Sequence, residues 1–446
     1  MPGSNIPIRS EDDLLVPFYE SLRTTQAVGI ECEKVGVRKD GSPITYSREV
    51  LALFDHLVTH HGWKAESEVP GGPLLSLSRG KSSVTLEPGG QFELSGAPLP
   101  DVHRVHQELV EHHEELTPPS RELGVRWLGI GFTPLAKRED LEWVPKTRYP
   151  IMREYLPTRG ALALDMMLRT CTVQANLDYA TEEDAMRKLR VMLKLAPITT
   201  AMFANSPFVE GARFGGVSQR AKVWLEVDPD RAGLVPPVWK DGARFEDYAR
   251  WALDVPMFLF KREGRFVVNT GQTFRAFWKD GFQGERATIA DWELHLATLF
   301  PEVRLKRTLE VRGADSQCIT HAAALPALYV GLVYDDKALA EADALTAAWT
   351  YDEVLGLRHR VWQDGLRTPF RGAPLVEAAQ RVVAIAQEGL ARRKRRDLRG
   401  RDEGVHLASI ASLVGRGMSP ADEMLAQIDP AKPLREEILR VASIDA

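Results

Sequence analysis

Residues 170–178 read TCTVQANLD, and polar and apolar side chains alternate along the whole stretch. Alternation with a period of two residues predicts a strand with one polar and one apolar face. The polar face consists of Thr170, Thr172, Gln174, Asn176 and Asp178. Because this face and similar ones below carry Thr, Gln, Asn and Glu with few lysines, we favour a wet, concave, ligand-binding surface. A face that is merely exposed to solvent is the alternative.

Two shorter stretches nearer the N-terminus show the same alternation, namely SVTLE (83–87) and QFELS (91–95). The Pro-Gly-Gly sequence between them predicts a turn, so that the two strands form a hairpin. With a three-residue loop, Glu87 and Glu93 lie on one face as diagonal neighbours, about 7 Å apart at Cβ. The hairpin then presents an acidic pair on its polar face.

The stretch VGIECEKVGV (28–37) predicts another strand, in which Glu31 and Glu33 share one face and Cys32 lies on the other. Two carboxylates at this spacing repel each other unless a cation lies between them. Solvent-exposed acidic pairs are common, so the pair alone is weak evidence for a metal. We interpret Cys32 as a core residue rather than a nucleophile, since a reactive thiol needs an exposed site that lowers its pKa.

The stretch RLKRTLEVRG (304–313) predicts one strand in which a single carboxylate stands in a row with cationic side chains. That row consists of Lys306, Thr308, Glu310 and Arg312. Together with the other strands it brings the number of carboxylates on polar faces to five. Glutamates clustered without His or Cys fit Mg²⁺ or Mn²⁺ rather than Zn²⁺. The spacing leaves open whether these strands meet in space.

The composition argues against several classes of protein. The chain has 446 residues, of which 44% are hydrophobic and 27% charged, and its formal net charge is −5. This acidic balance argues against a general nucleic-acid-binding protein, and no apolar run approaches the roughly 18 residues of a membrane helix. Three cysteines and an N-terminus without a signal-peptide pattern predict a cytoplasmic protein. Without repeats or low-complexity linkers, we expect residues 1–446 to form one intermixed domain.

Helical patterns flank the predicted strands, and some of them carry features that we interpret as structural. The predicted helices span residues 11–25, 48–61, 101–117, 182–204, 338–349 and 375–396. Three histidines of the helix at 101–117 indicate a solvated face rather than a transition-metal site; they are His103, His106 and His113. We interpret the basic run RRKRRDLRGR (392–401) as a solvated helix end rather than a nucleic-acid-binding patch. The chain has no GxxxxGK[ST] or GxGxxG loop, so a nucleotide has to be held by side chains and metals.

Beyond these patterns, the chain resembles the plant-type glutamate–cysteine ligases, a family also found in many bacteria. The matching stretches follow the family order from about residue 28 to 370. They include GIECEKVGV (29–37), SSVTLEPGGQFELSGAPL (82–99), PKTRYPIMREYLP (145–157), LALDMMLRTCTVQANLDY (162–179), MFANSPFVEG (202–211) and DWELHLATLFPEVRLKRTLEVRGAD (291–315). Residues 371–446 match more loosely and form a predicted helical C-terminal part.

The resemblance implies an α+β fold shared with glutamine synthetase, in which a curved antiparallel sheet forms a funnel-shaped active site and helices pack outside. It also implies that ATP phosphorylates the γ-carboxylate of L-glutamate and that the amine of L-cysteine then displaces phosphate. The product is γ-glutamylcysteine, in the first step of glutathione biosynthesis. Two alternatives stay open: a γ-glutamyl ligase of the same fold with another amine acceptor, and a catalytically silent homologue that binds metal and glutamate. We expect small-molecule substrates, neither nucleic acid nor membrane as partner, and a monomer or a homodimer.

The resemblance also implies a set of site residues. Two or more Mg²⁺ ions, with Mn²⁺ as the alternative, are expected on Glu31, Glu33, Glu87, Glu93 and Glu310. Phosphoryl transfer and carboxylate binding both use arginine, and we assign Arg312 to the phosphoryl group and Arg220 to glutamate. Family members have Arg-Ser-His-Ile-Trp where this chain has Arg-Ala-Lys-Val-Trp, which ends at Trp224. The arginine and the tryptophan are therefore kept, whereas the serine and the histidine are not.

Further candidates lie on or near the strand at 170–178, which is expected to line the funnel. Thr172 and Gln174 are predicted to contact the substrate's amino or carboxyl groups. Met166 and Arg169 come just before the strand, where a soft side chain can meet the cysteine thiol; filling of the core is the alternative for the methionine. Lys306 and Arg307 are candidates for the nucleotide phosphates, with a solvated charged strand as the alternative. Disulfide-based redox control is not expected with three cysteines.

Overall fold

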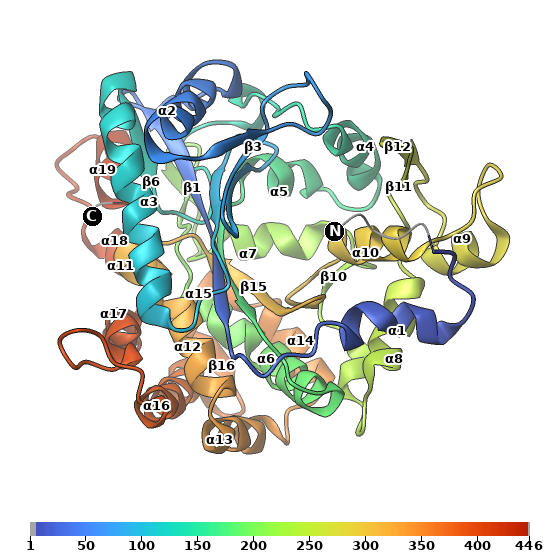
Figure 1. The fold of residues 1–446 in the computed structure, drawn as a ribbon. Helices are drawn as coiled ribbons and strands as arrows, with labels where there is room; N and C mark the ends of the chain where they lie inside the picture. Colours follow the sequence, from blue (N-terminus) through green and yellow to red (C-terminus); the bar gives the residue numbers. More distant parts are fainter. Residues whose placement is uncertain (1–5, 445–446) are drawn as a thin grey trace.

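The computed structural model describes residues 6–444 of the chain (Figure 1). Within these residues, nine strands form one sheet with the order β14-β15-β7-β1-β5-β4-β3-β2, and β6 pairs with the C-terminal half of β1. All the neighbours in this sheet are antiparallel. The strands are β1 (Val28–Arg38), β2 (Lys64–Glu66), β3 (Ser76–Arg79), β4 (Ser82–Leu86), β5 (Phe92–Ser95), β6 (Val125–Leu128), β7 (Thr172–Leu177), β14 (Val303–Leu305) and β15 (Leu309–Asp315). Strands that are far apart in the sequence therefore lie side by side.

Four short two-stranded ribbons complete the strands of the described part of the chain. They pair β8 (Phe208–Val209) with β9 (Ala212–Arg213), β10 (Ala232–Gly233) with β13 (Phe300–Pro301), β11 (Leu259–Arg262) with β12 (Arg265–Val268), and β16 (Pro369–Phe370) with β17 (Ala373–Pro374). The pair β10 and β13 is parallel, and it leads directly into the hairpin of β14 and β15.

Helices cover the apolar face of the sheet. The central helix α12 (Ala324–Val333) is buried along its whole length, because its residues are apolar or small on every side. It packs against β7 and against α16 (Leu375–Arg393), and α6 (Glu182–Met202) packs against β15. In Figure 1 these three helices gather below the sheet together with α13 (Asp336–Thr346), and α3 (Val102–Leu123) lies along β1 and β6.

The remaining helices surround this core. Up to residue 280 they are α1 (Glu11–Tyr19), α2 (Leu51–His61), α4 (Arg148–Tyr155), α5 (Ala163–Arg169), α7 (Gln219–Val223), α8 (Phe245–Leu253) and α9 (Phe274–Asp280). Further along they are α10 (Ile289–Ala297), α11 (Ile319–Ala322), α14 (Tyr351–Arg358), α15 (Val361–Asp364), α17 (Ala408–Gly415), α18 (Pro420–Ala426) and α19 (Leu434–Val441). No helix within residues 6–444 is both long enough and apolar enough to cross a membrane.

The α+β class and the antiparallel sheet expected from the sequence are confirmed. Most predicted helices are present, although α1 ends at Tyr19, earlier than expected, and α3 continues through Pro118 and Pro119 to Leu123. The prediction of one strand at 304–313 is wrong, because these residues form a hairpin of β14 and β15. The chain turns at Lys306, whose N–H donates to the carbonyl oxygen of Thr308 at 3.0 Å. Three consecutive polar residues form this turn. The alternation of polar and apolar residues therefore gives no sign that the chain reverses its direction here.

Candidate active site

One face of the sheet gathers acidic residues from separate strands. Glu33 on β1 lies directly opposite Glu93 on β5, and Glu93 in turn lies opposite Thr85 on β4. Glu31 lies opposite Gln174 on β7. The hairpin register predicted from the sequence is therefore confirmed, and the strands that carry the polar alternation meet on one surface.

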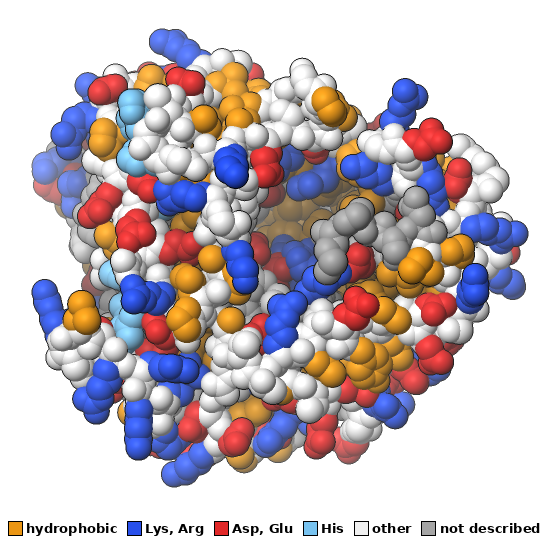
Figure 2. Space-filling model, in the orientation of Figure 1, with side chains coloured by type: hydrophobic (Ala, Val, Ile, Leu, Met, Phe, Trp, Pro, Cys, Tyr) orange, Lys and Arg blue, Asp and Glu red, His pale blue; other side chains and the backbone are white. Residues whose placement is uncertain are grey.

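A cavity of about 1100 Å³, its open mouth included, lies over this face. Figure 2 shows the hollow near the centre of the molecule, with lysine and arginine side chains inside it. Helices α4, α5, α7 and α10 contribute to the opposite wall. The predicted site residues that line the cavity are Glu31, Glu33, Glu87, Glu93, Met166, Thr172, Gln174, Arg220, Trp224, Lys306 and Arg312. Three predicted residues are not part of its lining, namely Arg169, Arg307 and Glu310.

The carboxylates of this cavity repel one another; Glu33 and Glu93 are buried, and Glu31 and Glu87 are half-buried. Burial, together with the charges of Glu310 and Glu93, raises the pKa of Glu31 to about 7. Burial and the neighbouring Glu87 and Glu93 raise the pKa of Glu33 well above its usual range. The pKa of Glu93 is also raised, by burial and by Glu87. The ionised forms of these groups are thus short of positive charge.

The donor set fits a hard divalent cation. No group of three or more His, Cys, Asp or Glu side chains within residues 6–444 has the arrangement of a metal site. The carboxylates nevertheless offer only oxygen ligands, which Mg²⁺ prefers. Their mutual repulsion is relieved by a cation placed among them. The residues present therefore match the chemistry of the predicted metal.

Glu310 differs from the other predicted ligands, because three cations surround it. Arg304 holds both of its oxygens, with Nη2 to Oε1 at 2.7 Å and Nε to Oε2 at 3.2 Å. Lys306 Nζ lies 2.9 Å from Oε2, and Arg312 Nη1 donates to Oε1. Burial opposes ionisation of Glu310, but Arg304, Lys306 and Arg312 outweigh it and hold its pKa well below the usual range. The part of the sheet formed by β14 and β15 therefore carries an excess of positive charge and forms the cationic wall of the site. Strand β7 separates it from the glutamates of β1, which belong to the acidic wall.

The short helix α7 presents Arg220 to the cavity. The helix begins after Ser218, whose hydroxyl donates to Asp315 Oδ1 at 2.9 Å and accepts the N–H of Ala221 at 3.0 Å. Arg220 Nη2 donates to the carbonyl oxygen of Arg312 at 2.7 Å. Arg220 Nε and Trp224 Nε1 are buried and have no hydrogen-bond partner within residues 6–444. These are donors that a bound ligand can satisfy.

Two residues of β7, Thr172 and Gln174, form hydrogen bonds with charged residues of the site. The Thr172 N–H donates to Glu33 Oε2 at 2.9 Å, and Gln174 Oε1 accepts from Arg312 Nη1 at 2.7 Å. Both residues therefore orient charged groups as well as line the cavity. Arg169 lies aside from the cavity lining and pairs with Asp165 and Glu210, with N···O distances of 3.1 and 3.2 Å.

The two candidates for the nucleotide phosphates are separated by the hairpin turn. Lys306 lines the cavity. Arg307 points to the surface, where Nη2 lies 2.5 Å from Glu293 Oε1 and 44% of its side chain is exposed. The turn of the hairpin sends these neighbours to opposite sides.

Sequence reasoning missed several residues of the cavity. Arg304, the main partner of Glu310, becomes visible only through the hairpin register, in which the two residues lie opposite each other. Arg148 and Tyr149 line the cavity from α4, and Met152 adds a thioether beside Met166. These residues of α4 lie in the stretch PKTRYPIMREYLP, whose resemblance to the family could have identified them as candidates.

Known proteins are similar to this chain over most of its length. Residues 27–443 match the family described as glutamate-cysteine ligase family 2. The chain is 42% identical over 441 residues to the glutamate–cysteine ligase of Arabidopsis thaliana, covering 96% of this chain and 83% of the relative. It is 44% identical over 422 residues to that of Brassica juncea, covering 93% of this chain and 80% of the relative.

A solved structure supports the fold. The glutamate–cysteine ligase of Francisella tularensis, solved in complex with AMP, superimposes with a TM-score of 0.59 at 11% identity. The match covers 94% of this chain and 88% of that chain. At this identity the comparison shows a shared fold, and it confirms the architecture expected from the sequence.

The prediction of a cytoplasmic protein is wrong. The relatives from Arabidopsis thaliana, Brassica juncea, Medicago truncatula and Solanum lycopersicum, which contradict it, are all named as chloroplastic enzymes. A low cysteine count indicates a reducing compartment but does not say which one. Because the family match spans most of the chain and curated relatives share 42–44% of its residues, the protein belongs to glutamate–cysteine ligase family 2.

Proposed function

We propose that this protein joins the γ-carboxyl group of L-glutamate to the amine of L-cysteine at the expense of ATP. The products are γ-glutamylcysteine, ADP and phosphate, and the reaction is the first step of glutathione biosynthesis. The observation that carries the proposal is that four glutamates line one cavity together with the cationic residues Arg220, Lys306 and Arg312. Phosphoryl transfer to a carboxylate needs this combination, because its reactants are all negatively charged.

The acidic wall is the proposed metal site. Glu31, Glu33, Glu87 and Glu93 would hold Mg²⁺, with Mn²⁺ as the alternative. Glu310 is the fifth proposed ligand and would join them by giving up part of its pairing with Arg304 and Lys306. When bound, the ions neutralise the phosphate oxygens and lower their repulsion toward the substrate carboxylate.

The cationic wall is proposed to stabilise the transferring phosphoryl group. An oxygen of the glutamate γ-carboxylate attacks the γ-phosphorus of ATP, the bond to the β-phosphate oxygen breaks, and ADP leaves. Arg312 and Lys306 lie where they can balance the charge that is transferred. Arg307 remains a proposed contact of the nucleotide, although its side chain lies at the surface here.

The wall formed by α7 is proposed to bind the amino-acid substrates. Arg220 would hold the α-carboxylate of glutamate through a guanidinium fork, with Trp224 beside it. Thr172 and Gln174 would contact amino or carboxyl groups from the sheet. The cysteine amine attacks the acyl carbon of the γ-glutamyl phosphate, gives up a proton, and displaces phosphate.

The acceptor side is proposed to lie near Met166, where Met152 and Met167 also line the cavity. Thioethers are soft and polarisable and suit a thiol. Arg169 is proposed to act at this edge, although its guanidinium now pairs with Asp165 and Glu210. We further propose that the chain forms one intermixed domain, as a monomer or a homodimer, since β1, β7 and β15 interleave in one sheet.

The test is ADP release by the purified protein with Mg²⁺ and ATP, given glutamate alone, glutamate with cysteine, or glutamate with other amines. ADP that requires both glutamate and cysteine, with the mass of γ-glutamylcysteine in the product, supports the proposal. ADP with a different amine reassigns the acceptor. Folded protein that releases no ADP with any combination contradicts the proposal and favours a silent homologue.

A further inference from the structure

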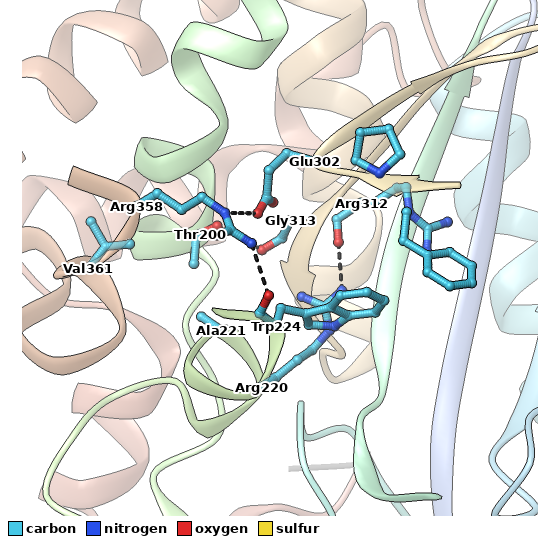
Figure 3. A pocket seen from close by; sticks show the side chains of 11 residues that line it. Thr200, Arg220, Ala221, Trp224, Glu302, Arg312, Gly313, Arg358 and Val361 are labelled. Atoms are coloured by element: carbon cyan, nitrogen blue, oxygen red, sulfur yellow. Dashed lines mark hydrogen bonds and ion pairs between the residues drawn. The ribbon is translucent and has the colours of Figure 1, made fainter. Parts of the chain in front are cut away.

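A second, smaller cavity of about 430 Å³, whose lining residues are drawn in Figure 3, adjoins the first. Four residues line both cavities, namely Arg220, Trp224, Phe300 and Arg312. The far wall of the small cavity contains Glu302 and Arg358, which the proposed reaction does not use. Because the shared residues include both proposed catalytic arginines, the far wall is in a position to control where they lie.

Glu302 and Arg358 form a partly buried ion pair that also reaches Trp224. Arg358 ends α14, and its Nε lies 2.6 Å from Glu302 Oε1. Its Nη2 donates to the carbonyl oxygen of Trp224 at 3.1 Å (Figure 3). The two side chains are only 11% and 14% exposed. Shielding from water makes such an ion pair stronger than one at the surface.

The same pair is connected to the backbone of Arg312. The carbonyl oxygen of Glu302 accepts the N–H of Arg312 at 3.0 Å. The carbonyl oxygen of Arg312 accepts from Arg220 Nη2 at 2.7 Å. Glu302 thus contacts both arginines: its backbone carbonyl oxygen binds the N–H of Arg312, and its carboxylate binds the guanidinium of Arg358. This ion pair therefore links three segments of the chain, namely helix α14, strand β15 and the segment that follows α7.

We infer that Glu302 and Arg358 are positioning residues that fix where Arg220 and Trp224 lie relative to Arg312. The inference rests on the proposed function and adds to it, because both residues lie outside the lining of the main cavity and act through the residues they hold. An arginine meets both acceptors at once through its planar fork. A lysine keeps the charge but lacks that fork, so Arg358→Lys keeps only part of the arrangement.

Arg358 also lies between the small cavity and a surface groove, because it lines both. The groove has a volume of about 1040 Å³, and Trp224 and Gly233 line it as well. Loss of its side chain joins groove and cavity, so that water reaches the acyl phosphate. Water then attacks the acyl carbon and phosphate leaves, which regenerates glutamate and consumes ATP without forming the dipeptide. Exclusion of water prevents this side reaction in the intact wall.

The experiment compares Glu302→Gln, Arg358→Lys and Arg358→Gln with wild type in the full-length protein. The matched controls are Arg38→Lys and Glu49→Gln, from an ion pair of similar length (2.8 Å) that lines neither cavity. We expect Glu302→Gln and Arg358→Gln to raise the KM for glutamate about tenfold while the KM for ATP changes less than about twofold. Arg358→Lys should lie between wild type and Arg358→Gln. The ratio of ADP to γ-glutamylcysteine should rise above that of wild type in Arg358→Gln alone.

Two outcomes overturn the inference while leaving the proposed function intact. One is an active wild type with no rise in the KM for glutamate in any of the three variants. The other is an equal rise in both KM values together with the same fall in Tm as in Glu49→Gln, which indicates a merely structural role. A variant that fails to turn over is assessed by the rise in Tm that glutamate produces; a rise equal to that of wild type also contradicts the inference. A folded wild type without ligase activity defeats the proposed function and the inference with it.

Discussion

Glu33 and Glu93 stand directly opposite each other on β1 and β5, and each is only 6% exposed. Like charges in this arrangement destabilise a sheet. The N–H of Thr172 and the hydroxyls of Ser95 and Thr85 bind these carboxylates and relieve part of the repulsion. The fold therefore retains an unfavourable contact at the place where a cation is proposed to bind.

Removing one of these charges should stabilise the protein and inactivate it. In Mg²⁺-free buffer at a pH that ionises both Glu33 and Glu93, Glu93→Gln is expected to increase the free energy of unfolding by about 1 kcal/mol, because the repulsion between the two charges disappears. Urea unfolding measures the gain in stability, and the ADP-release assay measures the loss of activity. Glu114→Gln, at an exposed position of α3, is the control and should change stability by less than about 0.5 kcal/mol. A less stable Glu93→Gln protein contradicts the proposed repulsion.

Metal removal should stop the reaction. Chelation with EDTA is expected to abolish ADP release by wild type, and added Mg²⁺ or Mn²⁺ should restore it. Glu31→Gln should reduce turnover at saturating Mg²⁺ by at least about 100-fold, since stabilisation of several kcal/mol is lost. Near-normal turnover in this variant would remove Glu31 from the set of ligands.

Arg220→Lys should raise the KM for glutamate, with little change in the KM for ATP. Lysine keeps the charge but cannot form the bidentate fork with a carboxylate. Initial rates at varied glutamate and saturating ATP provide the measurement. An unchanged KM for glutamate assigns Arg220 to another role.

Glu310 should be more important for stability than the other predicted ligands. Replacement by glutamine leaves Arg304, which is 9% exposed, without its ionic partner. Breaking a buried pair from one side costs about 3–5 kcal/mol. Urea unfolding of Glu310→Gln beside Glu31→Gln tests this difference, and equal stability of the two variants contradicts it.

The ion pair of Arg38 and Glu49 should make stability depend on acid pH. Burial opposes ionisation of Glu49, but hydrogen bonds from Arg38 and Thr45 outweigh it and lower the pKa from 4.5 to about 2. The pair therefore stabilises the fold fully above pH 4.5, and this contribution disappears as the pH falls toward 2. Glu49→Gln should lose about 2 kcal/mol at pH 7 and show a weaker dependence on pH between 4.5 and 2 than wild type. Identical pH dependence in the two proteins rules out this role.

The sequence predicts the acidic wall well, because period-two alternation decides which side chains share a face. The hairpin around the Pro-Gly-Gly turn has the expected register, and Glu87 and Glu93 both reach the cavity. Gly89 shows why a glycine is needed at this turn: a Cβ there would lie 2.2 Å from the carbonyl oxygen of Leu168.

The cationic wall is less predictable, since it depends on contacts across a turn that alternation does not detect. Arg304 and Glu310 are six residues apart and become partners only when the chain reverses at Lys306. Arg307 follows Lys306 in the sequence but points away from it, toward Glu293. Glu302 and Arg358 carry no sequence signal at all, because their meeting depends on how α14 packs.

The order of strands in the sheet also determines when the cavity can exist during synthesis. Strand β1 needs β7 beside it, and β7 needs β15, so residues near 31, 174 and 310 must all be in place. Contacts of such long sequence separation form late and slowly. A growing chain therefore exposes half-made strand edges until Asp315 has left the ribosome, and this long interval is where a chaperone is most needed.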